Sequence, residues 1–182
     1  MIPFPNQKFK AIYCDPPWNF KTYSKKGMDR APENHYPTMT LQDIKHLPVN
    51  TIADDDCALF MWVTMPLLQA GLEVMAEWGF TYKTCAFSWM KQNKKAPSLF
   101  TGLGYWTRSN AEICLLGTKG KPQRINKDVK QAILEPLREH SRKPDCVYER
   151  IERLVSGPYV ELFSRTSRPG WTSWGFDVGK FD

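Results

Sequence analysis

The sequence predicts a single α/β domain with a mainly parallel central sheet and helices on both faces. Three observations support this prediction. Short apolar runs typical of buried strands alternate with segments whose apolar residues recur at helical spacing. The first run, from Lys10 to Cys14, is apolar on both faces, as expected for a central parallel strand. The length of 182 residues is enough to bury one sizeable core.

Composition narrows the functional classes. The chain has 42% hydrophobic residues but no long apolar run, which excludes a membrane-spanning protein and a membrane partner. A formal net charge of +6 favours an anionic partner such as nucleic acid. The five cysteines are odd in number and lack CxxC spacing, so we expect neither disulfides nor a metal site. The N-terminus carries no signal pattern, and we expect a cytoplasmic protein.

The first predicted strand ends abruptly in Asp15, Pro16, Pro17 and Trp18. The two prolines can neither continue a sheet ladder nor enter a helix interior, so the chain must turn at Asp15. The turn presents a carboxylate, stiff backbone carbonyls and an aromatic face. This set suits a planar heteroaromatic amine: Asp15 and the Pro16 carbonyl would each accept one N–H, and Trp18 would stack on the ring. The alternative is a turn that only ends a strand.

Residues 19–37 follow the motif without periodicity, and a structureless segment of this length is usually functional or disordered. We predict a mobile gate over the base pocket, in which Lys21, Lys25 and Lys26 hold phosphates and Tyr36 lines the pocket. The alternative is a solvated surface loop.

The elements that follow complete the alternation. Thr40 is the expected N-cap of a short helix that Pro48 ends. A buried strand spans 57–63, and Pro66 opens a helix that ends at Gly79. We predict further strands at 84–90, 111–116 and 159–163, with a helix that begins at Pro144 before the last of these. Between 100 and 108 the chain is rich in glycine and aromatic residues, and Trp106 is either a substrate contact or a core residue.

The motif of residues 15–18 after an apolar strand resembles the catalytic motif of amino-methyltransferases that use S-adenosylmethionine. The fuller pattern resembles the family of the eukaryotic messenger-RNA adenosine methyltransferase and of bacterial and phage adenine methyltransferases. The supporting stretches occur in family order over nearly the whole chain: 35–39 (HYPTM), 59–63 (LFMWV), 104–117, 138–145 (REHSRKPD) and 160–163 (VELF).

The resemblance implies a Rossmann-like methyltransferase domain with a circularly permuted motif order, in which the catalytic turn precedes the cofactor strand. Cys14, Asp15 and Phe163, at the ends of adjacent strands, would then lie beside S-adenosylmethionine. Lys143 would hold the methionine carboxylate of the cofactor, in keeping with its place before a helix N-terminus. The alternative for Lys143 is a surface lysine.

Further site residues come from the resemblance alone. Arg165 is expected at the ribose hydroxyls of the cofactor, and Glu112 near the target nucleoside. The chain departs from the usual nucleotide fingerprint, since it has no GxGxxG. Phe176 stands where relatives carry an amide, so it would pack on the cofactor adenine instead, while Asp177 can still accept from the ribose.

The resulting expectation is transfer of a methyl group to the N6 amine of adenine in nucleic acid, without a metal. DNA is expected rather than RNA, because a short member without extra domains resembles the bacterial and phage members. With no separate recognition domain, sequence preference would come from loops, a second subunit, as in a homodimer, or a partner, or it would be weak. The alternatives are a catalytically silent nucleic-acid-binding subunit and a methyltransferase for cytosine, a protein amide or a small molecule.

Overall fold

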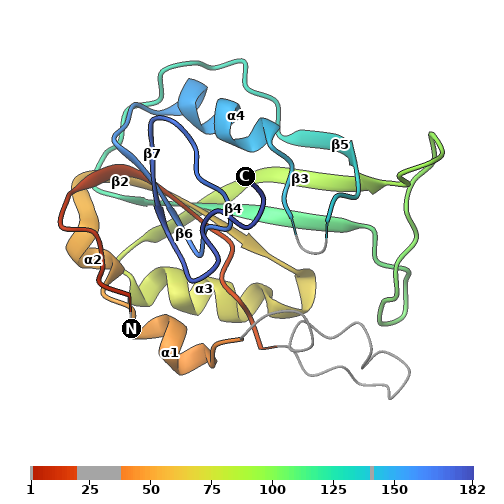
Figure 1. Ribbon diagram of the computed structural model, residues 1–182, viewed down its shortest axis with the longest axis horizontal. Helices are drawn as coiled ribbons and strands as arrows, with labels where there is room; N and C mark the ends of the chain where they lie inside the picture. Colours follow the sequence, from red (N-terminus) through yellow and green to blue (C-terminus); the bar gives the residue numbers. More distant parts are fainter. Residues whose placement is uncertain (1, 20–37, 140–141) are drawn as a thin grey trace.

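A seven-stranded sheet of order β5-β3-β4-β2-β1-β6-β7 forms the centre of the computed structural model, which describes residues 2–19, 38–139 and 142–182 (Figure 1). The strands are β1 (Phe9–Cys14), β2 (Ala53–Val63), β3 (Thr81–Gln92), β4 (Ala111–Lys119), β5 (Ala132–Pro136), β6 (Tyr159–Leu162) and β7 (Trp171–Trp174).

The sheet is mostly parallel, as predicted. β1 pairs in parallel with both β2 and β6, which makes it a central strand. The pairs β3–β5 and β6–β7 are also parallel. Strand β4 runs antiparallel to β2 and to β3, because it follows β3 through a hairpin rather than through a helical crossover.

Helices cover both faces of the sheet, which confirms the predicted α/β architecture (Figure 1). On one face lie α1 (Leu41–Lys45), α2 (Val49–Ile52), the 3₁₀ turn η3 (Met65–Leu67) and α3 (Leu68–Glu77). On the other face lies α4 (Cys146–Leu154).

Two apolar cores result, one on each face of the sheet. Because successive side chains of a strand point to opposite faces, β1 contributes to both. Ile12 and Cys14 pack with α1, α2 and α3, whereas Ala11 and Tyr13 pack with α4. Burial on both faces explains why β1 reads as an uninterrupted apolar run.

The helix ends follow the local chemistry of the sequence. The Thr40 hydroxyl caps α1 by accepting from the backbone N–H of Asp43, as predicted. Gly79 has a φ of +82° just after α3 and ends that helix, also as predicted. α1, however, ends at Lys45 rather than at Pro48, and Pro48 instead precedes the short helix α2.

Two strands were not predicted, and several are longer than expected. β5 and β7 are short edge strands with partly exposed side chains, so their apolar pattern is weak.

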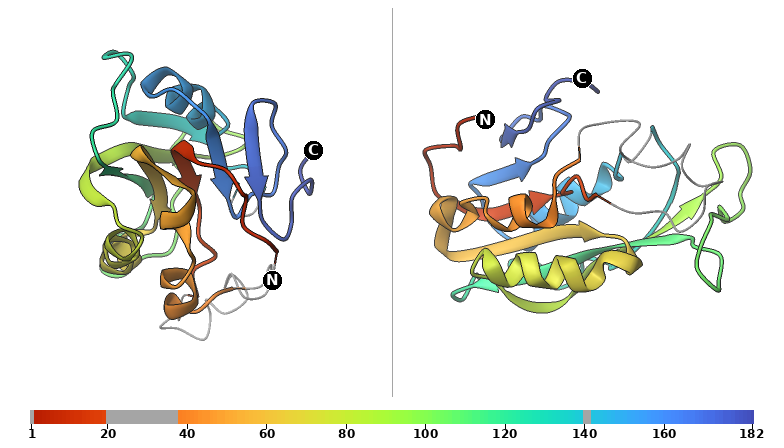
Figure 2. Two further views of the ribbon diagram at one scale, coloured as in Figure 1. Left: turned by 90° about the vertical axis from the view of Figure 1, so that its left-hand side faces the viewer. Right: turned by 90° about the horizontal axis from the view of Figure 1, so that it is seen from below.

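The Trp174 indole N–H of β7 donates to the Pro3 carbonyl, and Phe4 packs on the Trp174 ring with centroids 4.5 Å apart. The N-terminal segment therefore lies along this edge, as the left view of Figure 2 shows.

Within the described ranges, no helix is both long enough and apolar enough to cross a membrane. The predicted gate loop lies outside the described residues apart from Asn19, which is exposed.

Candidate active site

Asp15 lies directly after β1, at the carboxyl end of this interior strand. The chain reaches β2 from β1 through α1 and α2 on one face, whereas α4, on the other face, leads into β6. The carboxyl end of β1 is therefore the point at which the crossover connections diverge. In open α/β sheets this is where ligands bind.

A chain of ion pairs connects Asp15, after β1, to strands β4 and β3, which lie beyond β2 in the sheet. The Lys143 ammonium lies 2.6 Å from an Asp15 carboxylate oxygen and 3.2 Å from a Glu112 carboxylate oxygen. The other oxygen of Glu112 accepts from Lys91. Glu112 is on β4, Lys91 is on β3 and Lys143 lies just before α4. Four residues that are distant in sequence thus meet at one end of the sheet, where β1 and β3 end and β4 begins.

Burial and charge shift the pKa values of these groups in different directions. Burial raises the pKa of Asp15, and Lys143 opposes this rise only in part. Burial also acts to raise the pKa of Glu112, but the ammonium groups of Lys143 and Lys91 outweigh it and lower that pKa to about 2. Although burial disfavours the charged form of Lys143, Asp15 and Glu112 raise its pKa above the ordinary value. Glu112 is therefore ionised, and Lys143 is protonated, at neutral pH.

The turn after Asp15 is held by hydrogen bonds on both sides. The Trp18 backbone N–H donates to the Pro16 carbonyl at 2.8 Å, and the Met39 N–H donates to the Pro17 carbonyl at 2.9 Å. The Trp18 side chain is only 8% exposed, and its indole N–H donates to the Trp62 carbonyl at 3.3 Å. The turn is thus rigid, and Trp18 packs mainly in the apolar core beneath it.

Glu161 is a partly buried acid that sequence reasoning did not single out for a role. It pairs with Tyr13 of β1 in the sheet register, one residue before the pair of Cys14 with Leu162. The Tyr148 hydroxyl donates to it at 3.0 Å and the Ser164 hydroxyl at 2.7 Å. Burial raises the pKa of Glu161 to about 7, and these two hydrogen bonds limit the rise. The position of this glutamate inside an otherwise apolar strand is the sequence feature that could have indicated a functional role.

The turn after β6 contains two further candidates. Phe163 has a φ of +62° and packs edge to face on Trp174, with ring centroids 5.7 Å apart. The next residue, Ser164, donates its backbone N–H to the Trp174 carbonyl. The Arg165 guanidinium lies over the Phe181 ring, 5.2 Å from its centroid. β6 and β7 thus end in one packed unit beside Asp15.

The remaining predicted residues lie at different depths. Cys14 is fully buried, whereas Phe176 is 70% exposed. The Asp177 carboxylate pairs with Lys180 at 3.0 Å. Trp106 is 93% exposed, which excludes the core alternative for this residue. Four of the expected substrate contacts lie outside the described residues, namely Lys21, Lys25, Lys26 and Tyr36.

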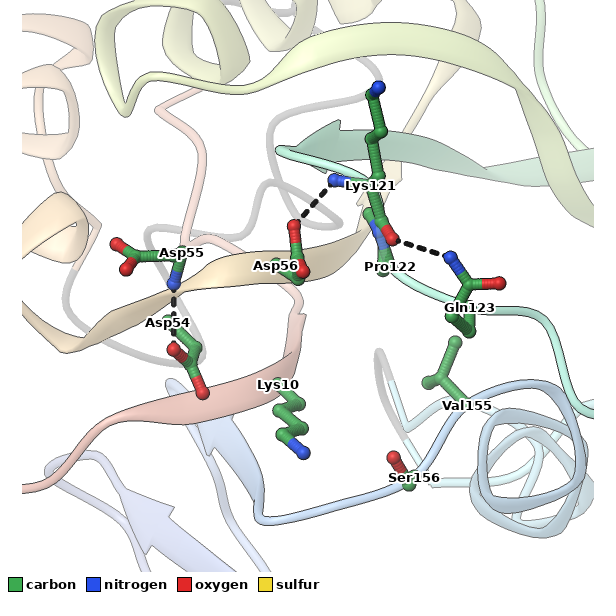
Figure 3. A pocket seen from close by; sticks show the side chains of 9 residues that line it. All are labelled: Lys10, Asp54, Asp55, Asp56, Lys121, Pro122, Gln123, Val155 and Ser156. Atoms are coloured by element: carbon green, nitrogen blue, oxygen red, sulfur yellow. Dashed lines mark hydrogen bonds between the residues drawn. The ribbon is translucent and has the colours of Figure 1, made fainter.

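A pocket of about 260 Å³ lies at the other end of the sheet, where β1 and β2 begin (Figure 3). It is lined by Lys10 near the start of β1, by Asp54, Asp55 and Asp56 near the start of β2, and by residues 121–123 and 155–156. Lys10 and Asp15 are separated by five residues of extended chain, roughly 17 Å at the usual rise per residue. The pocket is therefore separate from Asp15. In the part of the chain that the structure describes, no group of three or more His, Cys, Asp or Glu side chains is arranged to hold a metal ion.

Comparison with known proteins gives consistent similarities. A family model described as MT-A70 matches residues 9–177. The chain is 32% identical to the Type II methyltransferase M.MunI of Mycoplasma sp, over 96% of this chain and 79% of that protein. It is 33% identical to the N(6)-adenosine-methyltransferase catalytic subunit METTL3 of Homo sapiens and 34% identical to the METTL3 subunit of Danio rerio. Each of these alignments covers 92% of this chain but only 28% of the relative.

Proposed function

The chain belongs to the MT-A70 family, and we propose that it transfers a methyl group from S-adenosylmethionine to the exocyclic N6 amine of adenine in nucleic acid. The observation that carries the proposal is the position of Asp15. Its carboxylate lies at the end of β1, 24% exposed, on a turn that two prolines and two backbone hydrogen bonds hold in place.

The donor groups around Asp15 fit S-adenosylmethionine. The cofactor carries a carboxylate, ribose hydroxyls and an adenine ring. Lys143, which is 9% exposed and protonated, matches the carboxylate. Glu161 is a hydrogen-bond acceptor and Arg165 a donor, and both are suited to hydroxyl groups. When bound, the cofactor supplies an electrophilic methyl group on a sulfonium that leaves as a neutral thioether.

Asp15 acts as acceptor and orienter for the target amine. The lone pair of an aromatic amine is delocalised into the ring, so the nitrogen is a weak nucleophile. Asp15 accepts one N–H, the Pro16 carbonyl accepts the other with its remaining lone pair, and the nitrogen is drawn toward a tetrahedral form. Partly exposed Pro17 and the small exposed part of Trp18 form the surface on which the ring rests. As the new N–C bond forms, the nitrogen releases a proton to water, so no metal or strong base is required.

Lys143 must change partners during this cycle. In the present arrangement it holds Asp15 at 2.6 Å, which takes up acceptor capacity that the amine requires. Lys143 would release Asp15 if it paired with the carboxylate of a bound cofactor instead. Glu112 stays paired with Lys91 and keeps Lys143 within reach of both positions. Asp15 would then be free to accept from the target amine.

We favour DNA over RNA as the polymer. The chain covers 79% of the Type II methyltransferase M.MunI but only 28% of the relatives named for adenosine, the ribonucleoside. If the target lies in a duplex, the base must leave the stack to reach Asp15.

The test is incubation of the purified protein with isotopically labelled S-adenosylmethionine and either DNA or RNA, followed by nucleoside mass spectrometry. We expect label in N6-methyl-deoxyadenosine, reduced by at least about 10³-fold in Asp15→Asn, because orientation of the amine contributes several kcal/mol. Asp55→Asn is the matched control, since it makes the same chemical change on an exposed acid at the other end of the sheet, near the start of β2.

Label found only in RNA would agree with the proposed mechanism but show that the polymer is RNA. Label found in cytosine would agree with the proposed role of Asp15 but show that the target base is cytosine. Full activity of Asp15→Asn would refute the mechanism, and cofactor binding without label in either polymer would favour a silent partner subunit.

A further inference from the structure

The segment between β3 and β4, residues 93–110, projects past the end of the sheet as two consecutive turns, 93–98 and 102–109, which we together name the aromatic hairpin (Figure 1; also at the right of Figure 2). Backbone hydrogen bonds hold both turns. The Phe100 N–H donates to the Lys91 carbonyl at 2.8 Å, and the Gly102 N–H donates to the Ser109 carbonyl at 2.8 Å. The Asn110 amide donates to the carbonyls of Phe100 and Lys91. The hairpin is therefore held in one conformation although most of its side chains are exposed.

The tip of the second turn is built around Trp106, which has a φ of +67°. The Thr107 N–H donates to the Tyr105 carbonyl at 2.8 Å across it, so Trp106 is the centre of a three-residue turn. A bulky side chain rarely adopts this backbone conformation, and strain of this kind tends to occur at functional positions. Gly104 permits the close return of the chain, because a Cβ there would lie 2.1 Å from the Thr107 carbonyl oxygen. The result is an indole that is 93% exposed at the end of a rigid support.

Charge at the hairpin has a single sign. Residues 93–110 include Lys94, Lys95 and Arg108 and contain no aspartate or glutamate. All three basic side chains are exposed. Tyr105, 83% exposed, contacts Trp106 edge to face with ring centroids 6.5 Å apart. The aromatic hairpin therefore combines two exposed aromatic rings and Arg108 in its second turn with two exposed lysines in its first turn, and it carries positive charge alone.

The base of the hairpin adjoins the candidate active site. Lys91, near the end of β3, pairs with Glu112, near the start of β4, and Glu112 is linked through Lys143 to Asp15. The aromatic hairpin thus extends from the same end of the sheet that carries the turn at Asp15. A polymer bound with its target at Asp15 would have its neighbouring nucleotides near this element.

We propose that the aromatic hairpin is a nucleic-acid contact in which Trp106 stacks on an unstacked base beside the target nucleotide and Lys94, Lys95 and Arg108 contact phosphates. This inference rests on the proposed function, since it supposes a nucleic-acid substrate. Aromatic stacking accepts any base, while the phosphate contacts carry no sequence information. The hairpin therefore supplies affinity and register rather than sequence preference. An interface with another protein chain would also use exposed aromatic residues, but the absence of acidic side chains favours a polyanion.

The experiment measures binding of a fluorescein-labelled random-sequence DNA oligonucleotide, single-stranded and duplex, over a salt series. We expect Trp106→Ala to weaken binding of the single strand about tenfold, as loss of one base–aromatic stack predicts, and Trp106→Phe to retain most of the affinity. Replacement of Lys94 and Lys95 by alanine is expected to lower the slope of log K against log salt by about 0.7 for each lost phosphate contact. Tyr82→Ala, which removes an exposed aromatic residue near the opposite end of β3, is the matched control and should bind as the wild type.

Thermal unfolding and light scattering of each variant complete the experiment. Wild-type binding by a folded Trp106→Ala would overturn the inference even if methyl transfer is found. Unchanged binding with a change from dimer to monomer would overturn it in favour of a protein interface. Binding that depends on Trp106, without methyl transfer to any polymer, would support the hairpin and refute the proposed function.

Discussion

At the scale of single residues, the candidate site depends on a balance between two carboxylates and two lysine ammonium groups. Glu112 accepts from both Lys91 and Lys143, and Lys143 also holds Asp15. The Glu112, Lys91 and Lys143 side chains are 16%, 18% and 9% exposed, so water screens these charges weakly. Removal of one charge from such a group leaves its partner buried without compensation, which is strongly destabilising.

The first prediction concerns Glu112. We expect Glu112→Gln to lower the free energy of unfolding by about 3 kcal/mol, because Lys91 then loses its carboxylate partner and Lys143 keeps only Asp15. Lys91→Met in the same chain should recover part of this loss, with a coupling energy of about 1 kcal/mol or more in a double-mutant cycle measured by urea unfolding. The exposed pair of Arg153 and Asp128 is the control, where Asp128→Asn should cost less than about 1 kcal/mol. Additive effects of the Lys91 and Glu112 substitutions would contradict the prediction.

The second prediction follows from Glu161. Its pKa is about 7 in the folded protein, whereas the ordinary value is 4.5. Between these values the folded state holds a proton that the unfolded state has lost, so the free energy of unfolding falls as pH rises. We expect Glu161 to lower it by about 2–3 kcal/mol between pH 4.5 and pH 8, since each unit of pKa corresponds to about 1.4 kcal/mol.

Glu161→Gln keeps an acceptor for the Tyr148 and Ser164 hydroxyls but cannot titrate. Urea unfolding of both proteins at several pH values provides the measurement, and the difference between them isolates Glu161 from other titrating groups. Equal pH dependence in the wild type and the variant would show that Glu161 does not titrate in this range.

At the scale of elements, the ends of the strands position the chemistry. The turn after β1 is stiffened by two prolines, whereas the turn after β6 is held against the end of β7. Gly175 makes this second contact possible. A Cβ at Gly175 would lie 2.5 Å from the Ser164 carbonyl oxygen and 2.7 Å from its backbone nitrogen. Both neighbours are backbone atoms, which cannot rotate aside.

The third prediction uses this contact. We expect Gly175→Ala to destabilise the protein by about 2–3 kcal/mol, as is usual for overpacking in a closely packed region, and to weaken cofactor binding. Gly170→Ala is the control. Gly170 has a φ of +81° but open space around its Cβ position, so only backbone strain of about 1 kcal/mol applies. Thermal unfolding ranks the two variants, and an equal or larger effect at Gly170 would contradict the role of close packing at Gly175.

At the scale of the whole molecule, the sheet order brings the carboxyl ends of β1, β2, β3, β5, β6 and β7 and the start of β4 to one end of the sheet. This end carries Asp15, the ion-pair chain and the base of the aromatic hairpin. The opposite end carries the pocket lined by Asp54, Asp55 and Asp56 (Figure 3). A protein with a net charge of +6 thus presents its acidic cluster away from the candidate substrate side.

The fourth prediction tests the assembled site. A ligand that binds only the folded state at a concentration 100-fold above its Kd raises the free energy of unfolding by about 2.7 kcal/mol, or roughly 5–10 °C in Tm for a chain of this size. We expect S-adenosylmethionine and S-adenosylhomocysteine to produce such a shift. ATP shares the adenosine but lacks the amino-acid carboxylate that Lys143 would hold, so it should not. An equal shift with ATP would contradict the assignment of Lys143.

Much of the element order could be predicted from the sequence by itself. The apolar character of β1, the acid and prolines that end it, the cap at Thr40 and the glycine after α3 are local features, and local chemistry determines them. The motif order also pointed to the family to which the chain belongs. The short edge strands β5 and β7 were missed because an edge strand is only partly buried and has a weak apolar pattern.

Only the tertiary structure decided which side chains meet. Lys143 and Asp15 are separated by 128 positions, and no local pattern indicates that they form an ion pair. The same holds for Glu112 with Lys91, which a hairpin brings together, and for Glu161, whose burial beside β1 raises its pKa. Sequence determines where strands begin, end and turn, because those preferences act between near neighbours. Partners across the sheet depend on strand order and register, which the packing of the whole chain decides.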